Sequence, residues 1–418
     1  MHRRIVYSVS LLLILSIAPQ VFGQTSDWSG RWAGTATIEG MPGGMELTLS
    51  KDGDTWKSTM TLRAGGQELA PPVENLFIRG ANASFSVPVN GRVARFVGKF
   101  EGNALSGTYE VFENEKKIGD GTFNLTRGGQ MPPLRANPGQ VADPNFNSKV
   151  ANPAYKKDGP RVLFDEAHNN FHTATGRYKP FADLIGNDGY RIVPNKQKFS
   201  AAILKDFRVL IISNALGAAR MNDSRANNPA FTDEESDAVR DWVRAGGDLL
   251  LIADHAPMGS ANQILAQRFG VDMSKKYTID KENFDKDSGN RGFIVYTRET
   301  GRLADHPLTR GRNQSERINK VIAFTGQSLK GPEGSFPFMR LADSAEDVFG
   351  DEKPVSAAGR AQGIALKFGK GRVIVMGEAG MLTAQVTGPE QRPFGMNIPG
   401  IDNRQLVLNM MHWLTGKL

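Results

Sequence analysis

Hydrophobic and polar residues alternate with a period of two through the first third of the chain. The clearest runs are residues 45–49, 56–62, 83–87, 93–97, 105–109 and 121–125, and turn-forming pairs such as Asn90-Gly91 separate them. Short alternating runs at this spacing are typical of antiparallel β structure with a turn between neighbouring strands. We therefore predict a domain of about eight strands over residues 24–128, folded as a small all-β barrel or sandwich.

The pattern changes after residue 160. Mainly apolar runs at 162–164, 209–213, 248–253 and 372–376 alternate with stretches in which apolar residues recur every three or four positions. One such stretch starts at Thr232-Asp-Glu-Glu235, which has the composition of a helix capping box. Apolar strands alternating with amphipathic helices are typical of a parallel sheet covered on both faces. We predict that residues 161–418 form an α/β domain, a flavodoxin-like three-layer sandwich with a mainly parallel sheet.

Two further segments have a composition unlike either domain. Residues 129–160 are rich in Pro, Asn and Gly without periodicity, which predicts a linker. Residues 1–23 begin with basic residues, continue with a short apolar run and end in Val21-Phe-Gly23, as a cleaved signal peptide does. We therefore expect an exported protein, periplasmic or extracellular, with no membrane span in the mature chain. Export also removes nucleic acid from the expected partners.

The amino-acid composition excludes several kinds of chemistry. A hydrophobic fraction of 39% with 23% charged residues is that of a globular protein, and the net charge of +7 comes from scattered basic residues. The chain has no cysteine. Disulfides, thiolate metal ligands and a cysteine nucleophile are therefore excluded.

Polar side chains follow each of the predicted apolar strands of the second domain. The carboxyl ends of parallel strands meet at one edge of a sheet, where ligands bind, so we expect these side chains to form one site. Taken singly, each has a structural alternative: a carboxylate that anchors a turn, or a packed histidine. The residues concerned are Asp165, Glu166, His168 and His172 after the first strand, Asn214 after the second, Asp254 and His255 after the third, and Glu378 after the fourth.

Three sequence motifs of the second domain resemble those of a known superfamily. They are Val-Leu-Ile-Ile-Ser-Asn at 209–214, Trp-Val-Arg-Ala-Gly-Gly-Asp-Leu-Leu-Leu-Ile-Ala at 242–253 and Gly-Lys-Gly-Arg-Val-Ile-Val at 369–375. Together they resemble the class I glutamine amidotransferase-like superfamily, in particular its cysteine-less branch in gliding-motility auxiliary, intraflagellar-transport and trehalose-utilisation-type proteins. In the first domain, Trp28-x-Gly-x-Trp32-x-Gly34 is similar to a lipocalin-like β module.

The resemblance implies where the site lies and excludes one reaction. True amidotransferases carry a cysteine directly after the strand that 249–253 matches, and here Asp254-His255 stands there. Of the late His-x-Glu pair of that superfamily only Glu378 remains. Glutamine hydrolysis through a thiolate is therefore excluded.

Two functions from different classes fit these residues. In the first, the protein is a hydrolase in which Asp165, Glu166, Asp254, His255 and Glu378 are catalytic and Asn214 binds substrate. Imidazole and carboxylate groups are ligands of Zn²⁺ or a similar divalent ion, so Asp165, His168, His172 and His255 are candidate metal ligands. Without a metal, Asp and His would act as a general acid and base. In the second, the protein is a non-catalytic module that binds a small molecule, a carbohydrate or an envelope component.

Overall fold

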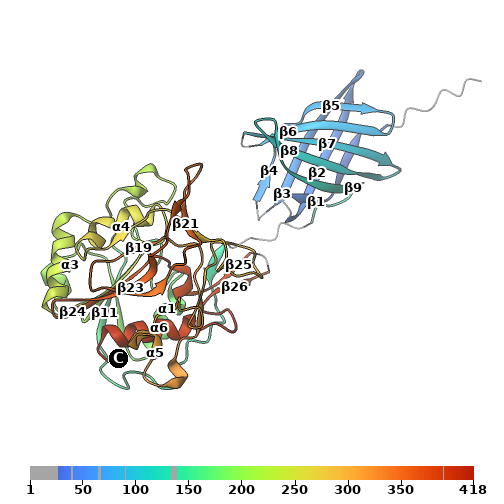
Figure 1. Ribbon diagram of the computed structural model, residues 1–418. Helices are drawn as coiled ribbons and strands as arrows, with labels where there is room; N and C mark the ends of the chain where they lie inside the picture. The colour runs from blue at the N-terminus through green and yellow to red at the C-terminus, as the bar shows by residue number, and fades with distance from the viewer. Residues whose placement is uncertain (1–26, 39–40, 65–66, 90, 133–138, 389) are drawn as a thin grey trace, which may run out of the picture. The chain divides into compact units, whose positions relative to one another are not determined.

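The computed structural model describes residues 27–38, 41–64, 67–89, 91–132, 139–388 and 390–418. The chain divides into two compact units, residues 1–137 and 138–418 (Figure 1). The signal peptide predicted at 1–23 lies outside the described residues. Within these residues, no helix combines the length and the apolar character that crossing a membrane requires.

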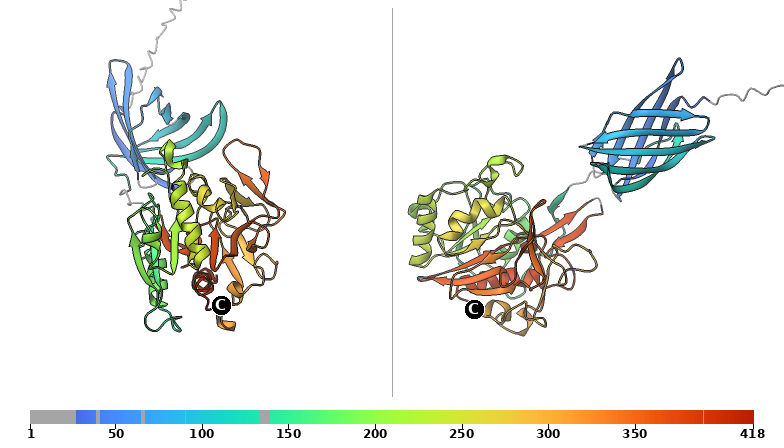
Figure 2. Two further views of the ribbon diagram at one scale, coloured as in Figure 1. Left: turned by 90° about the vertical axis from the view of Figure 1, so that its left-hand side faces the viewer. Right: turned by 45° about the horizontal axis from the view of Figure 1, so that its top comes forward.

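The first unit is a single curled antiparallel sheet (Figure 2). Its nine strands follow the order β4-β3-β2-β1-β9-β8-β7-β6-β5, and no ladder joins the edges β4 and β5 in the described residues. The predicted barrel or sandwich is therefore wrong. The strands are β1 Gly30–Ile38, β2 Met41–Asp52, β3 Thr55–Ala64, β4 Gln67–Leu69, β5 Glu74–Arg79, β6 Asn82–Val89, β7 Arg92–Glu101, β8 Ala104–Glu113 and β9 Lys116–Arg127.

Aromatic side chains fill the inside of this curled sheet. Trp32 is fully buried, and the ring of Trp28 stacks on Phe100 with 4.4 Å between ring centroids. The glycines of the sequence pattern give these rings room. A Cβ on Gly107 would lie 2.0 Å from a carbonyl oxygen of the neighbouring strand and 2.8 Å from the ring of Phe123. The inward-pointing side chains, which alternate along the strands, therefore fill the inside of the sheet.

The second unit is built on a mixed nine-stranded sheet in the order β12-β11-β13-β14-β24-β23-β19-β15, with β20 also paired to β23. Only the ladders from β12 to β24 are parallel, and the others are antiparallel. The strands are β11 Arg161–Asp165, β12 Arg191–Asn195, β13 Val209–Ser213, β14 Asp248–Ile252, β15 Asp272–Met273, β19 Leu329–Lys330, β20 Phe336–Arg340, β23 Ala361–Phe368 and β24 Gly371–Met376.

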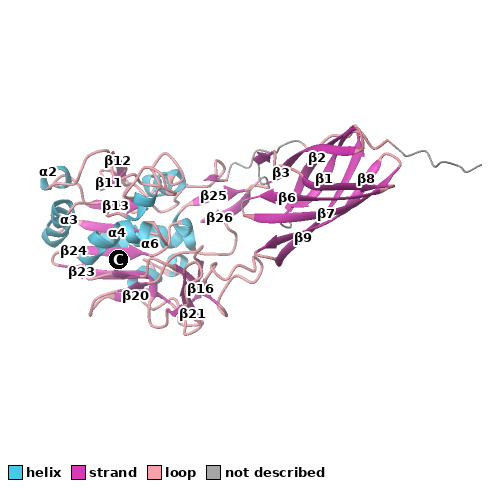
Figure 3. Cartoon of the chain, turned by 90° about the horizontal axis from the view of Figure 1, so that it is seen from above, coloured by secondary structure: helices cyan, strands magenta, loops and turns pink. Residues whose placement is uncertain are grey.

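The prediction of a flavodoxin-like three-layer sandwich with a mainly parallel sheet is wrong. Strands dominate the chain and the described residues form six α-helices, of which two have four residues (Figure 3). The decisive connection is the one between β23 and β24, which leaves only Gly369 and Lys370 between the strands. A parallel connection needs about a dozen residues or more, so these strands form a hairpin and the sheet turns antiparallel there.

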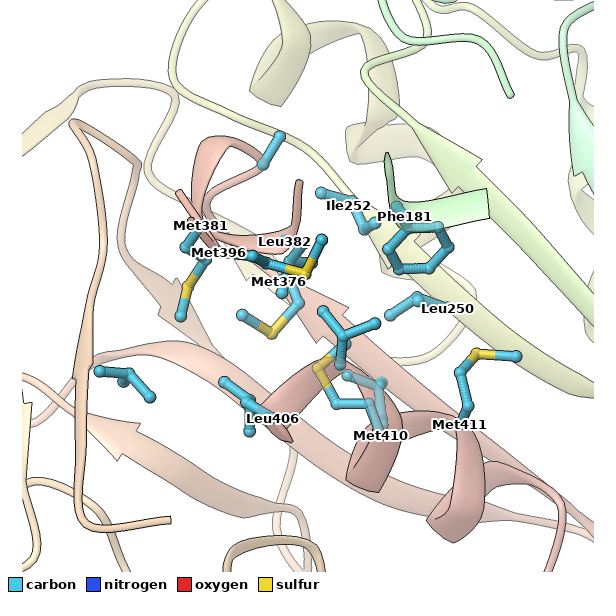
Figure 4. Packing of buried hydrophobic residues seen from close by; sticks show 14 of the residues in the cluster. Phe181, Leu250, Ile252, Met376, Met381, Leu382, Met396, Leu406, Met410 and Met411 are labelled. Atoms are coloured by element: carbon cyan, nitrogen blue, oxygen red, sulfur yellow. The ribbon is translucent and has the colours of Figure 1, made fainter. Parts of the chain in front are cut away.

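Helices cover both faces of the parallel strands because alternate strand residues point to opposite faces. Leu250, Ile252 and Met376 pack with residues of α1 and α6 (Figure 4), whereas Leu249 and Leu251 pack with residues of α3 and α4. The capping box predicted at 232–235 is confirmed at the start of α3. The helices are α1 Lys179–Asn187, α2 Ala201–Leu204, α3 Asp233–Ala245, α4 Met258–Gln267, α5 Pro307–Arg310 and α6 Asn403–Leu414, and the 3-10 helices are η1 Ser224–Asn227, η2 Gln314–Glu316 and η3 Gly380–Leu382.

Small sheets and the segment predicted as a linker complete the second unit. Of residues 129–160, those from 139 onward pack against this unit, since β10 pairs with β25 and the backbone N–H of Ala154 donates to Asp188. Three small sheets contain β10 Gln140–Ala142, β25 Ala384–Thr387 and β26 Arg392–Gly395; β16 Tyr277–Asp280, β21 Ala345–Val348 and β22 Val355–Ser356; and β17 Val295–Thr297 and β18 Lys320–Ile322.

Asp248, at the start of β14, makes the stability of this sheet pH-dependent. Burial raises the pKa of its carboxyl from 3.8 to about 6, against the opposing effects of Arg208 and of the Arg372 backbone N–H. The raised value means that folding favours the protonated form. The stabilisation is complete below pH 3.8 and is lost as the pH rises through about 6.

We expect Asp248→Asn to gain stability relative to the wild type by up to about 3 kcal/mol between pH 4 and pH 7.5. The asparagine keeps the shape and removes the charge whose burial is unfavourable. Urea unfolding at the two pH values measures the difference, with the exposed Asp206→Asn as control. If the unfolding free energies of variant and wild type differ by the same amount at both pH values, Asp248 is not the cause of the pH dependence.

Candidate functional site

The residues after β11 form a closed network around His168. Its Nδ1 lies 2.9 Å from Oδ2 of Asp165 and its Nε2 lies 2.9 Å from Oε1 of Glu235 on α3. Both partners are carboxylates, which only accept, so both ring nitrogens donate. The ring packs against Phe199 and Phe231, each with its centroid 4.7 Å away. All three polar groups are nearly inaccessible to solvent. The network ties the first strand to a helix and leaves no lone pair on His168.

The charges of this network support one another. Burial opposes a charged His168, but the hydrogen bonds and charges of Asp165 and Glu235 outweigh it and raise its pKa. Burial likewise opposes a charged Glu235, yet the backbone N–H of Thr232 and the imidazolium lower its pKa. Asp165 also accepts from the side-chain amides of Asn170 and Asn195. The network therefore holds an imidazolium between two carboxylates.

His172 belongs to a different, less charged environment. Its Nδ1 lies 3.1 Å from Oγ of Ser213, and its ring stacks on Tyr178 with centroids 4.5 Å apart. Burial, assisted by the charge of Arg177, lowers the pKa of His172 to about 3. His172 is thus neutral at physiological pH. Tyr178 is fully buried and donates its hydroxyl to the carbonyl of Ala379, 2.7 Å away.

Asn214 and Asp254 join the ends of the two central strands. The Asn214 side chain donates to Oδ2 of Asp254 and accepts from the Asp254 backbone N–H, both at 2.9 Å. The other oxygen of Asp254 accepts from the backbone N–H of Ala379, 3.0 Å away, in the loop after β24. Asp254 itself remains partly exposed. Three strand ends thus fix one carboxylate.

Glu378 provides a second carboxyl group behind Asp254. It is almost fully buried, and its oxygens accept from the backbone N–H groups of Gly380 and Met381 at the start of η3, at 2.6 and 2.7 Å. Burial first, and the charge of Asp254 second, raise the pKa of Glu378 well above its usual value. Burial also raises the pKa of Asp254, against the effects of His255, Asn214 and Ala379. Mutual repulsion therefore favours a proton on this pair.

His255 and Glu166 occupy the rim. His255 donates from Nδ1 to the carbonyl of Ala256 at 2.7 Å and stacks on Tyr277 with centroids 4.0 Å apart. When neutral, its Nε2 is therefore unprotonated, and within the described chain it has no hydrogen-bond partner. Glu166 has both oxygens engaged, one with the Ala174 backbone N–H and one with Lys196. Only His255 thus offers a free functional group.

The backbone around these strand ends is strained. Four residues other than glycine adopt positive φ angles there: Asn169 at 50°, Asn214 at 49°, Lys275 at 62° and Thr325 at 63°. Asparagine tolerates this conformation, whereas a β-branched threonine does so rarely. Strain of this kind gathers at sites where function constrains the backbone. It supports a functional role for this edge of the sheet.

The structure thus separates the predicted site residues into two groups. Asn214, Asp254, His255 and Glu378 come together at the ends of β13, β14 and β24, whereas Asp165, Glu166 and His168 are bound to other partners. Among the residues that the structure describes, no three His, Asp or Glu side chains are arranged to hold a metal ion. The four candidate metal ligands, Asp165, His168, His172 and His255, are therefore not brought together as a metal site.

Three residues of this site escaped the sequence reasoning. Tyr178 reads as one position of an apolar helical stripe, although its hydroxyl reaches the loop after β24. Gln327 donates to the carbonyl of Asp254 at 2.9 Å from a segment with no strand or helix signal. Glu235 was recognisable as part of a capping box but not as a partner of His168, 67 residues away in the chain. Contacts at such separations leave no local pattern in a single sequence.

A groove of about 440 Å³, largely open to solvent, lies along α1 and β12. None of the strand-end carboxylates contributes to it. It is lined by Ser148, Ala174, Thr175, Ala182, Asp183, Gly186, Asn187, Ile192 and Pro194. The groove and the Asp254 site are therefore separate features.

Comparisons with known proteins give similarities to solved structures only. No protein-family model and no curated protein sequence matches the chain. The chain is similar to the solved structure of the mmIFT52 N-terminal domain, with 13% identity, a TM-score of 0.44 and coverage of 61% of this chain and 97% of the other. It is also similar to the cytoplasmic protein STM1381 from Salmonella typhimurium LT2 (12% identity, TM-score 0.32, coverage 62% and 99%). A third similar structure is a ThuA-like protein from Parabacteroides merdae (11%, 0.34, 62% and 91%).

We expect His168→Ala to destabilise the second unit by about 3–5 kcal/mol, because it leaves two buried carboxylates without their cation. Since the pKa of His168 is raised, its contribution is complete below 6.5 and is lost as the pH rises through the raised value. Urea unfolding measures both effects. The rim variant His255→Ala is the control, and an equal loss in both variants would contradict the structural role.

Proposed function

We propose that this protein is a hydrolase that acts by acid–base chemistry at the carboxyl ends of β13, β14 and β24. The observation that carries the proposal is the Asp254 carboxyl group. The residue is partly exposed, while its carboxyl group is held by Asn214 and the Ala379 backbone N–H and has a pKa that burial raises, beside the buried Glu378. A carboxyl group whose pKa is raised toward the working pH is suited to proton transfer.

The neighbouring groups supply complementary roles. A protonated Asp254 gives its proton to the leaving group, while Nε2 of His255 takes a proton from the attacking water. The charge of Asp254 raises the pKa of the buried Glu378, which lies behind Asp254 and acts on the substrate only through it. Asn214 fixes the orientation of Asp254. The chemistry proposed is hydrolysis of an ester, amide or glycosidic bond in an exported protein.

We expect Asp254→Asn to lower kcat by about 100-fold or more, because it removes the transferable proton and retains the shape. A panel of chromogenic esters, anilides and glycosides identifies a substrate that the wild type hydrolyses. The variant and the exposed control Asp206→Asn are then compared on that substrate. Failure of the wild type to hydrolyse any member, or equal rates in the wild type and Asp254→Asn, would contradict the proposal.

A second candidate is a non-catalytic module that binds carbohydrate. It is favoured by His255 and Tyr277, whose rings stack beside Asp254. The hydroxyl of Tyr277 and Nε2 of His255 have no hydrogen-bond partner in the described part of the chain. Such groups, with the carboxyl of Asp254, suit sugar hydroxyls.

If binding is the function, Tyr277→Ala will weaken the binding of envelope oligosaccharides by about tenfold. Neither the wild type nor Asp254→Asn will then show turnover. Calorimetric titration of oligosaccharides into the wild type and Tyr277→Ala measures this. Saturable binding without any turnover would favour this candidate over the hydrolase.

A further inference from the structure

Arg177 is a partly buried cation without an anionic partner among the described residues. Its guanidinium carbon lies 4.4 Å from the centroid of the Phe171 ring. Its guanidinium forms no ion pair or hydrogen bond with any residue that the structure describes. Burial lowers the pKa of Arg177, and no neighbouring negative charge offsets the effect. By contrast, the partly buried Arg312 is paired with Glu316 at 2.6 Å.

Arg177 lies at the same edge of the sheet as the Asp254 site. Its own carbonyl accepts from Oγ1 of Thr383, 2.7 Å away, and the next residue, Tyr178, donates to Ala379. Both contacts reach the segment that follows β24 and carries Glu378. The charge of Arg177 also acts on His172, which lies beside Ser213 at the end of β13. The backbone of Arg177 is therefore tied to the loop that positions Asp254.

The unfavourable free energy of a partly buried guanidinium without a partner indicates that Arg177 binds a ligand. A guanidinium that loses part of its hydration without gaining a hydrogen-bonded partner is destabilising. Stacking on an aromatic face orients the guanidinium plane and leaves its N–H groups at the edge free. Those N–H groups form a planar fork that matches the two oxygens of a carboxylate or of a phosphate-type group. The missing partner is thus an oxyanion.

We propose that Arg177 binds an oxyanion carried by the substrate, so that the site acts on acidic molecules. The substrate part of this inference rests on the proposed hydrolase function, whereas the anion site itself does not. A carboxylate and a phosphate-type group share the required geometry. The experiment therefore uses one probe for each source.

The test is calorimetric titration of the full mature chain with sodium phosphate and with sodium acetate, at an ionic strength held constant with chloride. We expect saturable binding of at least one ion by the wild type. Arg177→Gln should weaken it at least tenfold. Arg177→Lys keeps the charge but loses the fork and should lie between the two. The exposed control Arg220→Gln should bind as the wild type does, because general surface charge is not the cause. Binding of phosphate alone assigns a phosphate-type group, and binding of acetate alone assigns a carboxylate.

Two outcomes would overturn the anion site: no binding of either ion by the wild type, or an equal loss in Arg177→Gln and Arg220→Gln. Asp254→Asn separates this site from the proposed function. If it binds the anion normally and loses turnover, both stand. If it retains turnover while Arg177→Gln loses the anion, the hydrolase mechanism fails and the anion site stands. Circular dichroism of Arg177→Gln checks that its loss of binding is not a loss of the fold.

Discussion

The pairing of Asn214 with Asp254 is the interaction on which the rest of the site depends. The amide of Asn214 is donor and acceptor to the same residue, and its own backbone bonds to Ile252 and Phe171. Buried polar groups at strand ends need partners because water does not reach them. By satisfying the end of β14 in this way, Asn214 frees one oxygen of Asp254 for the Ala379 backbone N–H. The loop after β24, and with it Glu378, takes its place from that bond.

Around this pairing the carboxyl edge has a charged part and a part that retains protons. In the charged part, Asp165, His168 and Glu235 neutralise one another and make a rigid link between strand and helix. In the other part, the charge of Asp254 raises the pKa of the buried Glu378, and no imidazole is hydrogen-bonded to both carboxyl groups in the described residues. The same residue types thus have opposite protonation states in the two parts. The difference lies in whether an imidazolium stands between the carboxylates.

The sequence predicts the local elements of the second unit well and their assembly less well. The apolar runs at 209–213 and 372–376 and the capping box at Thr232 carry their own periodicity or capping signals, and all are confirmed. The prediction of a mainly parallel sheet is wrong at β23. The two residues between β23 and β24 are too few for a parallel connection, so these strands form a hairpin. The polar strand ends were recognisable as a group. Which of them would face His168 and which Asp254 depended on contacts across the fold, which no local pattern records.

The order of strands also sets the time at which the second unit can fold. β24, made of Gly371–Met376, lies between β14 and β23 in the middle of the sheet although it comes near the end of the chain. Until it is present, β14 has an open edge and the loop that positions Asp254 does not exist. Pairings of high sequence separation form slowly. The central sheet of the second unit therefore cannot be completed before Gly371–Met376 has been made.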